Sequence, residues 1–191
     1  MKITLLGNCQ TKALTWHIQQ LNENFDVKWL QPEFGRGFAW AQPGIFRKKP
    51  TPTITGTEDS TQRLKRSSFL IYQPISPATS KNFNFEKIKS YNPECHFISI
   101  SSFYFYPDCP QQTGLSGMID RAKRFNIDIP AHKIIEKHGS SITIESSGQC
   151  PAHPTVFYFL ELVREICAKT GWDYYSDEQY NQYLKEGYPF G

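Results

Sequence analysis

The sequence lacks any long uninterrupted run of apolar residues. A membrane-spanning helix needs about 20 such residues in a row, and no stretch of the 191-residue chain approaches that length. The apolar run near the start, Ile3 to Leu6, is also too short for a secretory signal peptide and ends at Gly7-Asn8. We therefore expect a protein without a membrane span that works in the cytoplasm.

Paired cysteines are also missing. The chain has five cysteines, an odd number, and no two of them have C-x-x-C spacing: Cys9, Cys95, Cys109, Cys150 and Cys167. This pattern argues against both a disulfide framework and a zinc knuckle. Cys95 opens an apolar strand and Cys167 lies on the apolar face of a predicted helix, so we expect both to be small buried hydrophobic side chains.

A strong charge of one sign is the third absence. The formal net charge of +3 is too small to indicate nucleic-acid binding. Basic residues form two short clusters, Arg47-Lys48-Lys49 and the group Arg63, Lys65 and Arg66. Solvated surface charge is the simpler interpretation of each cluster, and the phosphate of a small ligand is the alternative.

The residues that are present favour one globular α/β domain. Hydrophobic residues make up 39% of the chain and aromatic residues 15%, which is enough for a single core. The first segment is predicted to form a strand at Lys2–Leu6, a helix from Gln10 to about Leu21, and a strand at Phe25–Leu30. Such a strand–helix–strand unit predicts a parallel sheet with right-handed crossovers.

The rest of the chain continues this alternation. Further strands are predicted at 69–72 and 96–100, with a short one at 142–144, and helices at 60–66, 85–91, 115–125, 131–137, 154–169 and 177–185. Pro154 is expected in the first turn of its helix. The pattern predicts a single three-layer α/β domain with a mostly parallel central sheet. Residues 31–59, rich in proline, glycine and threonine, are interpreted as a long loop that acts as a lid or a binding loop, unless they are disordered.

Ligands of open parallel sheets bind beyond the carboxyl ends of the strands. Three predicted strand ends therefore bring their following residues to one place: Gly7 to Gln10, Gln73-Pro74, and Ser101 to Tyr106. We expect the functional site at this edge of the sheet.

Cys9 has the position of an activated cysteine. It follows a strand and precedes a helix, where free backbone N–H groups and the helix dipole favour a thiolate. The same N–H groups can stabilise an oxyanion. Gly7 allows the tight turn and Asn8 offers an amide donor. A buried cysteine in an ordinary strand-to-helix turn explains the spacing equally well.

A nucleophilic cysteine usually needs a base, and the chain has five histidines: His17, His96, His132, His138 and His153. His153 is the preferred base because it precedes Pro154 in a loop that can reach the carboxyl edge of the sheet, although a loop residue that caps the helix is the alternative. His17 is expected to be half-buried packing, and His96 begins a strand. His132 and His138 are expected to be solvated. Asp108 and Glu145 are the carboxylates that could orient the base.

Four motifs in order resemble the WcbI-type polysaccharide biosynthesis family. They are Gly7-Asn8-Cys9-Gln10, Ile71-Tyr72-Gln73-Pro74, the stretch Ser101 to Pro107, and His153-Pro154. The resemblance implies a fold similar to the SGNH (GDSL-like) hydrolases, with cysteine in place of serine. It also implies coenzyme A binding and acetyl transfer to precursors of capsular or other surface polysaccharides. Cys9 would then be the nucleophile and His153 its base, with Asn8, Gln10 and Gln73 lining the pocket.

The chain departs from SGNH hydrolases where Cys150 replaces the aspartate three residues before the histidine. The third role of a triad is therefore unassigned, and a Cys–His pair is the extent of the prediction. The leading hypothesis is transfer of an acyl group from acetyl-coenzyme A to a glycan or small molecule. The phosphates of coenzyme A would contact Lys12, Arg47, Lys48 and Lys49. The binding site would be completed by Ser101, Ser102 and Tyr104. The alternatives are a thiol esterase or deacetylase at the same residues, and a non-catalytic module that binds coenzyme A or a glycan.

Overall fold

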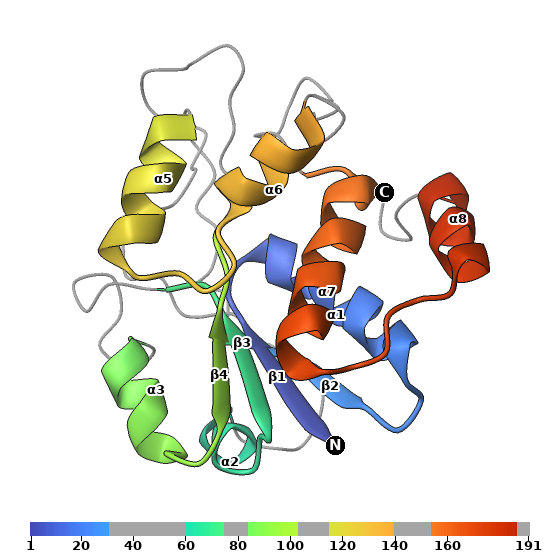
Figure 1. Cartoon of the computed structure of the whole chain (residues 1–191). Helices are drawn as coiled ribbons and strands as arrows, with labels where there is room; N and C mark the ends of the chain where they lie inside the picture. The colour runs from blue at the N-terminus through green and yellow to red at the C-terminus, as the bar shows by residue number, and fades with distance from the viewer. Residues whose placement is uncertain (31–59, 75–83, 103–114, 140–153, 187–191) are drawn as a thin grey trace, which may run out of the picture.

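The computed structural model describes residues 1–30, 60–74, 84–102, 115–139 and 154–186. Its sheet contains four parallel strands in the order β2-β1-β3-β4. They are β1 (Lys2–Leu6), β2 (Asp26–Leu30), β3 (Phe69–Tyr72) and β4 (His96–Ser99). Their carboxyl ends lie at the upper edge of the sheet in Figure 1. The predicted parallel sheet is confirmed.

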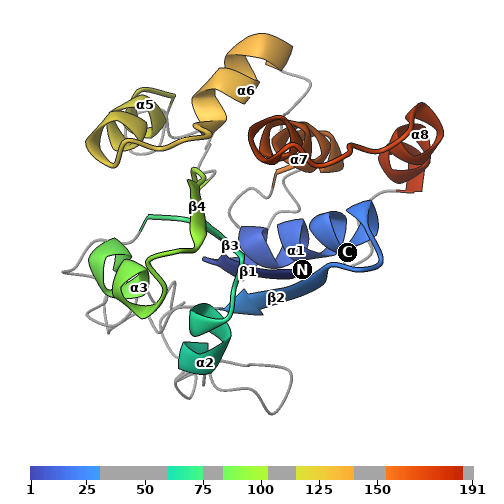
Figure 2. The same ribbon diagram turned by 60° about the horizontal axis from the view of Figure 1, so that its bottom comes forward.

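Helices cover both faces of this sheet. The described helices are α1 (Cys9–Leu21), α2 (Ser60–Lys65), α3 (Phe85–Tyr91), α5 (Leu115–Arg124), α6 (Ala131–His138), α7 (Val156–Thr170) and α8 (Asp177–Glu186). Figure 2 shows α1 and α7 on one face and α2 and α3 on the other. The predicted three-layer α/β arrangement is therefore confirmed. In the part of the chain that the structure describes, no helix combines the length and apolar character that crossing a membrane requires.

The alternation of side chains along β1 supplies both cores. Ile3 and Leu5 point into the larger core, which includes residues of α1, α5, α6 and α7. Leu6 points into the smaller core together with Leu64 of α2 and Ile88 of α3. Successive residues of a strand face opposite sides of the sheet, so a strand covered on both faces reads as a continuous apolar run. This is why the predicted strand Lys2–Leu6 matches the observed one.

One predicted helix begins later than expected. The Thr155 hydroxyl accepts a hydrogen bond from the Tyr158 N–H, so Thr155 is the N-cap and α7 starts at Val156. Pro154 therefore lies before the cap and not in the first turn. A threonine side chain that accepts a bond from the third helical residue fixes the boundary more strongly than the tolerance of proline for the first turn. The predicted strand at 142–144 lies outside the described residues.

Arg63 joins the amino ends of β1 and β2 to α2. Its side chain is 1% exposed, and it donates to the Thr4 hydroxyl and the Ile3 carbonyl and forms an ion pair with Asp26. Burial opposes ionisation of Asp26, but the hydrogen bond and charge of Arg63 outweigh it and lower the pKa of that carboxyl. Arg63 was predicted to be solvated, and that prediction is wrong because the buried guanidinium finds these partners only in the assembled sheet.

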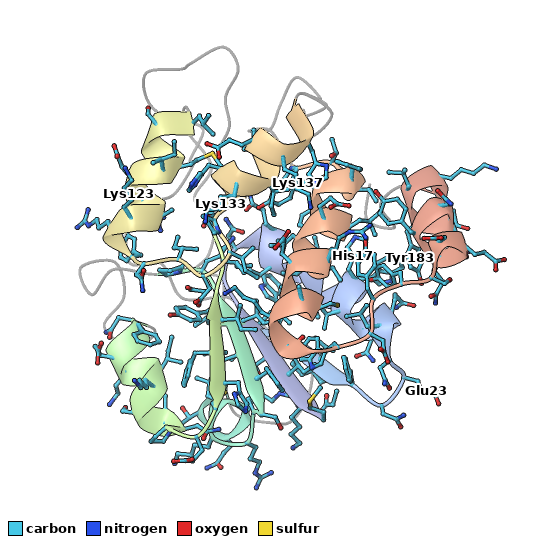
Figure 3. All side chains as sticks on the ribbon, in the orientation of Figure 1. His17, Glu23, Lys123, Lys133, Lys137 and Tyr183 are labelled. Carbon is cyan, nitrogen blue, oxygen red and sulfur yellow. The ribbon has the colours of Figure 1, made fainter. Side chains whose placement is uncertain are left out.

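His17 lies in the interface between α1, α7 and α8. Its ring is fully buried, stacks on Phe159 and contacts Tyr183 edge-on, while its backbone carbonyl accepts a hydrogen bond from the Tyr175 hydroxyl. Figure 3 labels His17 and Tyr183 in this region. Burial lowers the pKa of His17 to about 4. Half-buried packing was predicted, and the structure shows complete burial.

The carboxyl end of β4 continues beyond its last residue. Ile100 forms a parallel bridge with Ile129, and the Ser101 N–H donates to the Ile129 carbonyl at 3.2 Å. Since α6 begins at Ala131, its first turn lies near the carboxyl end of β4. The end of β4 therefore leads into Ser101, and the segment that precedes α6 lies beside it.

Candidate functional site

The turn from Gly7 to Gln10 joins the carboxyl end of β1 to α1. Asn8 is the N-cap of this helix, because its Oδ1 accepts the Gln10 N–H at 2.9 Å and its carbonyl accepts the Thr11 N–H at 3.0 Å. Asparagine is among the best capping residues for this reason. Cys9 is the first residue of α1, one position earlier than the predicted start of the helix. The strand-to-helix position of Cys9 is thus as the sequence indicated.

Gln73 connects the end of β3 to this turn. Its Oε1 accepts the Asn8 N–H at 3.0 Å, and its Nε2 lies 3.4 Å from Gln10 Oε1. The side chain is buried, and its backbone N–H donates to the Leu6 carbonyl. The structure therefore brings Gln73 and the cysteine turn together. Gln73 binds the turn and fixes its position, and the role that the family resemblance implied for it, lining the pocket, stays a prediction.

Gly7 is required by close approach rather than by its backbone dihedral angle. A Cβ atom at this position would lie 2.5 Å from Gln73 Oε1 and 2.7 Å from Thr11 Cγ2. The described glycines with a left-handed φ are Gly139 and Gly171, not Gly7. The absence of a side chain at Gly7 lets the Gln73 amide reach the Asn8 N–H.

Trp29 is a further residue of the turn that the sequence analysis missed. Its Nε1 lies 3.1 Å from the Gly7 carbonyl and 2.9 Å from the Thr11 hydroxyl, and donates to both. Lys12 Nζ lies 5.7 Å from the centre of the Trp29 ring, within the range of a cation–π contact. The sequence feature that could have revealed this contact is the position of Trp29 near the end of a strand that pairs with β1. Lys12, a predicted phosphate contact, is exposed on α1 beside this ring.

The hydrogen bonds of the turn restrict how it can stabilise negative charge. The Asn8 N–H donates to Gln73, the Gln10 N–H to the Asn8 side chain, and the Thr11 N–H to the Asn8 carbonyl. An oxyanion at this helix end would have to use the Cys9 N–H or displace one of these oxygen atoms. The predicted oxyanion site therefore has fewer available backbone N–H donors than the N-terminus of an uncapped helix would offer.

Ser101 and Ser102 lie directly beyond β4 at the same edge of the sheet. Both are buried, with about one twentieth of each residue exposed (5% and 6%). Of the other predicted site residues, Arg47, Lys48, Tyr104 and His153 lie outside the described residues, as do Lys49, Asp108 and Glu145. Pro154, which follows His153, is buried, and α7 begins on the carboxyl side of the sheet (Figure 1).

The remaining histidines are described. His96 is exposed and stacks on Phe69 at the amino end of β4, remote in register from the cysteine turn. His138 was predicted to be solvated, but only 20% of its side chain is exposed, and its Nε2 lies 3.1 Å from Oε2 of the buried Glu161. The packing of α6 on α7 creates this pair, and its residues are too far apart in the sequence for local patterns to reveal it. His132 is likewise only partly exposed.

Two of the other thiols are unreactive by position. Cys95 and Cys167 are buried, as predicted. Burial raises the pKa of Cys95 to about 11. Burial, assisted by the charge of Asp173, raises the pKa of Cys167 to about 12. At neutral pH both remain protonated, so neither is a candidate nucleophile.

No protein-family model matches this chain, and no curated protein matches it significantly. The fold and the site together define an α/β protein with a cysteine at a capped helix N-terminus on the carboxyl edge of a parallel sheet.

Proposed function

We propose that the protein transfers an acetyl or another acyl group from coenzyme A to a sugar hydroxyl in surface or capsular polysaccharide synthesis. The observation that carries this proposal is the Gln73–Asn8 hydrogen bond of 3.0 Å, which fixes the cysteine turn at the ligand-binding edge of the sheet. The ordered motifs that resemble the WcbI-type family supply the choice of coenzyme A and polysaccharide. A free nucleophilic thiol also requires a reducing compartment, so we place this activity in the cytoplasm.

In the proposed reaction, His153 removes the proton of the Cys9 thiol. The thiolate attacks the thioester carbonyl, and the carbonyl oxygen becomes an oxyanion beside the Cys9 N–H. The C–S bond to coenzyme A then breaks, and the departing sulfur takes the proton from the His153 imidazolium. This leaves the acyl group on Cys9 and a neutral histidine.

The second half of the reaction uses the same two residues. His153 accepts the proton of the sugar hydroxyl as its oxygen attacks the Cys9 thioester. The C–S bond to Cys9 breaks, and the thiolate recovers the proton from His153. In a direct variant of this mechanism, His153 activates the sugar hydroxyl for attack on acetyl-coenzyme A, and Cys9 only contacts the acyl group.

The first prediction tests Cys9 itself. Release of coenzyme A from acetyl-coenzyme A in the presence of candidate acceptor glycans is measured for the wild type, Cys9→Ala and the control Cys95→Ala. A nucleophile contributes several orders of magnitude to the rate, so we expect Cys9→Ala to lose at least about a hundredfold in kcat. Cys95→Ala removes a buried thiol in the smaller core and should keep its activity wherever it remains folded.

Full activity of Cys9→Ala would exclude covalent catalysis. An acetylated Cys9 detected by mass spectrometry, and lost in the same variant, would support the two-step route. Hydrolysis of acyl esters by water without coenzyme A would assign the thiol esterase or deacetylase reaction to this site instead.

The occupied amides of the turn favour a second candidate, a non-catalytic module that binds coenzyme A or a glycan. The hydrogen bonds of Asn8, Gln10 and Thr11 leave little room for an oxyanion. This candidate predicts that iodoacetamide labels Cys9 at neutral pH no faster than it labels a free thiol. Labelling much faster than that, at pH 7, would indicate a thiolate and favour the enzyme.

A further inference from the structure

Arg121 of α5 reaches the carboxyl end of β3. Its Nη2 donates to the Pro74 carbonyl at 2.9 Å. Pro74 directly follows Gln73, whose side chain binds the cysteine turn. The Arg121 guanidinium also lies 5.1 Å from the centre of the Phe125 ring, a cation–π contact on the same helix. The adjacent residues Gln73 and Pro74 therefore connect Arg121 to the cysteine turn.

The charge of Arg121 has no protein counter-charge in the part of the chain that the structure describes. A guanidinium is always charged and carries five N–H donors. Arg63 is paired with Asp26, and Arg164 with Glu161. No described carboxylate forms an ion pair with Arg121, although its Nε is shielded from solvent and has no hydrogen-bond partner among the described residues. Arg121 as a whole is partly exposed, but a shielded N–H donor without an acceptor is costly, so its environment is incomplete.

A second nitrogen atom without a partner among the described residues comes from the neighbouring helix. Nδ1 of His132 is shielded from solvent and makes no hydrogen bond to any described residue. His132 lies in the first turn of α6, which follows the Ile129 segment that extends the end of β4. Since α5 and α6 pack against each other and both contribute to the larger core, as α1 does, these two nitrogen atoms belong to neighbouring helices.

We propose that Arg121, assisted by His132, forms a subsite for an anionic group of the substrate, a carboxylate or a phosphate. The planar fork of a guanidinium matches both groups, and charge-assisted hydrogen bonds to them are the strong kind. The inference rests on the proposed function in one respect: the anion belongs to a reactant of the Cys9 site. The substrate class is then either an acidic or phosphorylated sugar acceptor, or the phosphate-bearing end of coenzyme A.

The test measures anion binding by the full chain, without any reaction. Isothermal titration is run with inorganic pyrophosphate and with glucuronate for the wild type, Arg121→Gln and the control Arg124→Gln. Arg124 is an exposed arginine of the same helix, 5.5 Å from the same Phe125 ring. We expect Arg121→Gln to weaken binding of at least one probe by about tenfold or more, and Arg124→Gln to change it by less than about twofold.

Each result has a definite meaning. Weakening for pyrophosphate alone assigns a phosphate, and weakening for glucuronate alone assigns a carboxylate; either supports the subsite. Unchanged binding of both probes by a folded Arg121→Gln variant overturns it, and equal losses in Arg121→Gln and Arg124→Gln overturn it by showing general surface charge. If Arg121→Gln does not fold, Arg121→Lys, which can still donate to the Pro74 carbonyl, replaces it with an expected loss of about threefold.

A His132 pair and the Cys9 variant complete the design. His132→Asn, which keeps a hydrogen-bonding group near the Nδ1 position, should retain more anion binding than His132→Leu; equal binding by the two excludes the role of His132. Cys9→Ala should bind both probes normally. If acyl transfer is not found, the binding measurements still decide whether the anion subsite exists. If Cys9→Ala loses activity while Arg121→Gln binds both probes normally, the acyl-transfer proposal stands and only the anion subsite is rejected.

Discussion

Single side chains decide the electrostatics of this protein. Buried polar groups need partners, and most described ones find them: Thr4 bonds Ser67 at 2.6 Å, and the buried Glu161 faces both His138 and Arg164. The shielded Nε of Arg121 has no hydrogen-bond partner among the described residues, and the proposed anion would supply one. His17 is distinctive for another reason, because it is buried in a largely aromatic and apolar environment.

His17 makes stability depend on pH. Its pKa is about 4 in the folded protein and 6.5 as a free side chain. Below pH 6.5 the unfolded chain binds a proton at His17 that the folded chain does not, so the free energy of unfolding falls as the pH falls toward 4. A difference of this size corresponds to about 3 kcal/mol across that window.

Urea unfolding of wild type, His17→Leu and His96→Gln between pH 7 and 4.5 measures this effect. The control His96→Gln removes an exposed histidine and should keep the slope of the wild type. His17→Leu should show a flatter dependence, with the difference growing toward low pH. Identical slopes for His17→Leu and wild type would show that His17 becomes protonated without unfolding.

At the scale of elements, the cysteine turn depends on a neighbouring strand. Asn8 caps α1 through its own side chain. The Asn8 N–H, however, donates to the side-chain oxygen of Gln73 at the end of β3, 65 residues away in the sequence. Trp29 near the end of β2 donates to the Gly7 carbonyl from the other side. The turn is therefore fixed by both strands that flank β1.

Replacement of Gln73 tests this support. Gln73→Leu leaves the Asn8 N–H without its acceptor, which should lower the free energy of unfolding by about 1–3 kcal/mol. Gln73→Glu keeps an acceptor for the Asn8 N–H, and at a pH where its buried carboxyl group is protonated it adds no charge beside Gln10, so under that condition it should cost clearly less. Denaturant unfolding compares the two variants. Equal losses would mean that the volume of the side chain, not its hydrogen bond to Asn8, stabilises the turn.

At the scale of the whole molecule, the sheet separates two cores. Cys95 belongs to the smaller core with α2 and α3, and Cys167 to the larger core with α1 and α7. Each core therefore contains one buried thiol with a raised pKa. These thiols report independently on the opening of the two faces.

Thiol labelling of a variant in which Cys9, Cys109 and Cys150 are serine tests whether the faces unfold together. We expect Cys95 and Cys167 to react with a thiol reagent only through opening of the structure, at rates at least about a hundredfold below those in urea. Peptide mapping separates the two sites. Equal, strongly slowed rates would indicate cooperative unfolding. Rapid labelling of either thiol in native buffer would contradict its burial.

The sequence determined the elements and their order in the chain. The continuous apolar runs of β1 and β3 and the helical spacing in α1 are local periodicities, and the alternation of strands with helices led to a parallel sheet. Because parallel strands share a carboxyl edge, the order of elements alone was enough to place Gly7, Gln73 and Ser101 at one edge of the sheet. The identity of a cysteine at the start of α1 is equally local.

Only the tertiary structure decided how these parts contact one another. The strand order placed Gln73 against Asn8 and required a glycine at position 7, since a Cβ there would overlap the Gln73 amide. Helix packing buried Arg63 and His17 and paired His138 with Glu161. Such contacts join residues far apart in the chain, and their free energies depend on burial and geometry that local patterns do not encode.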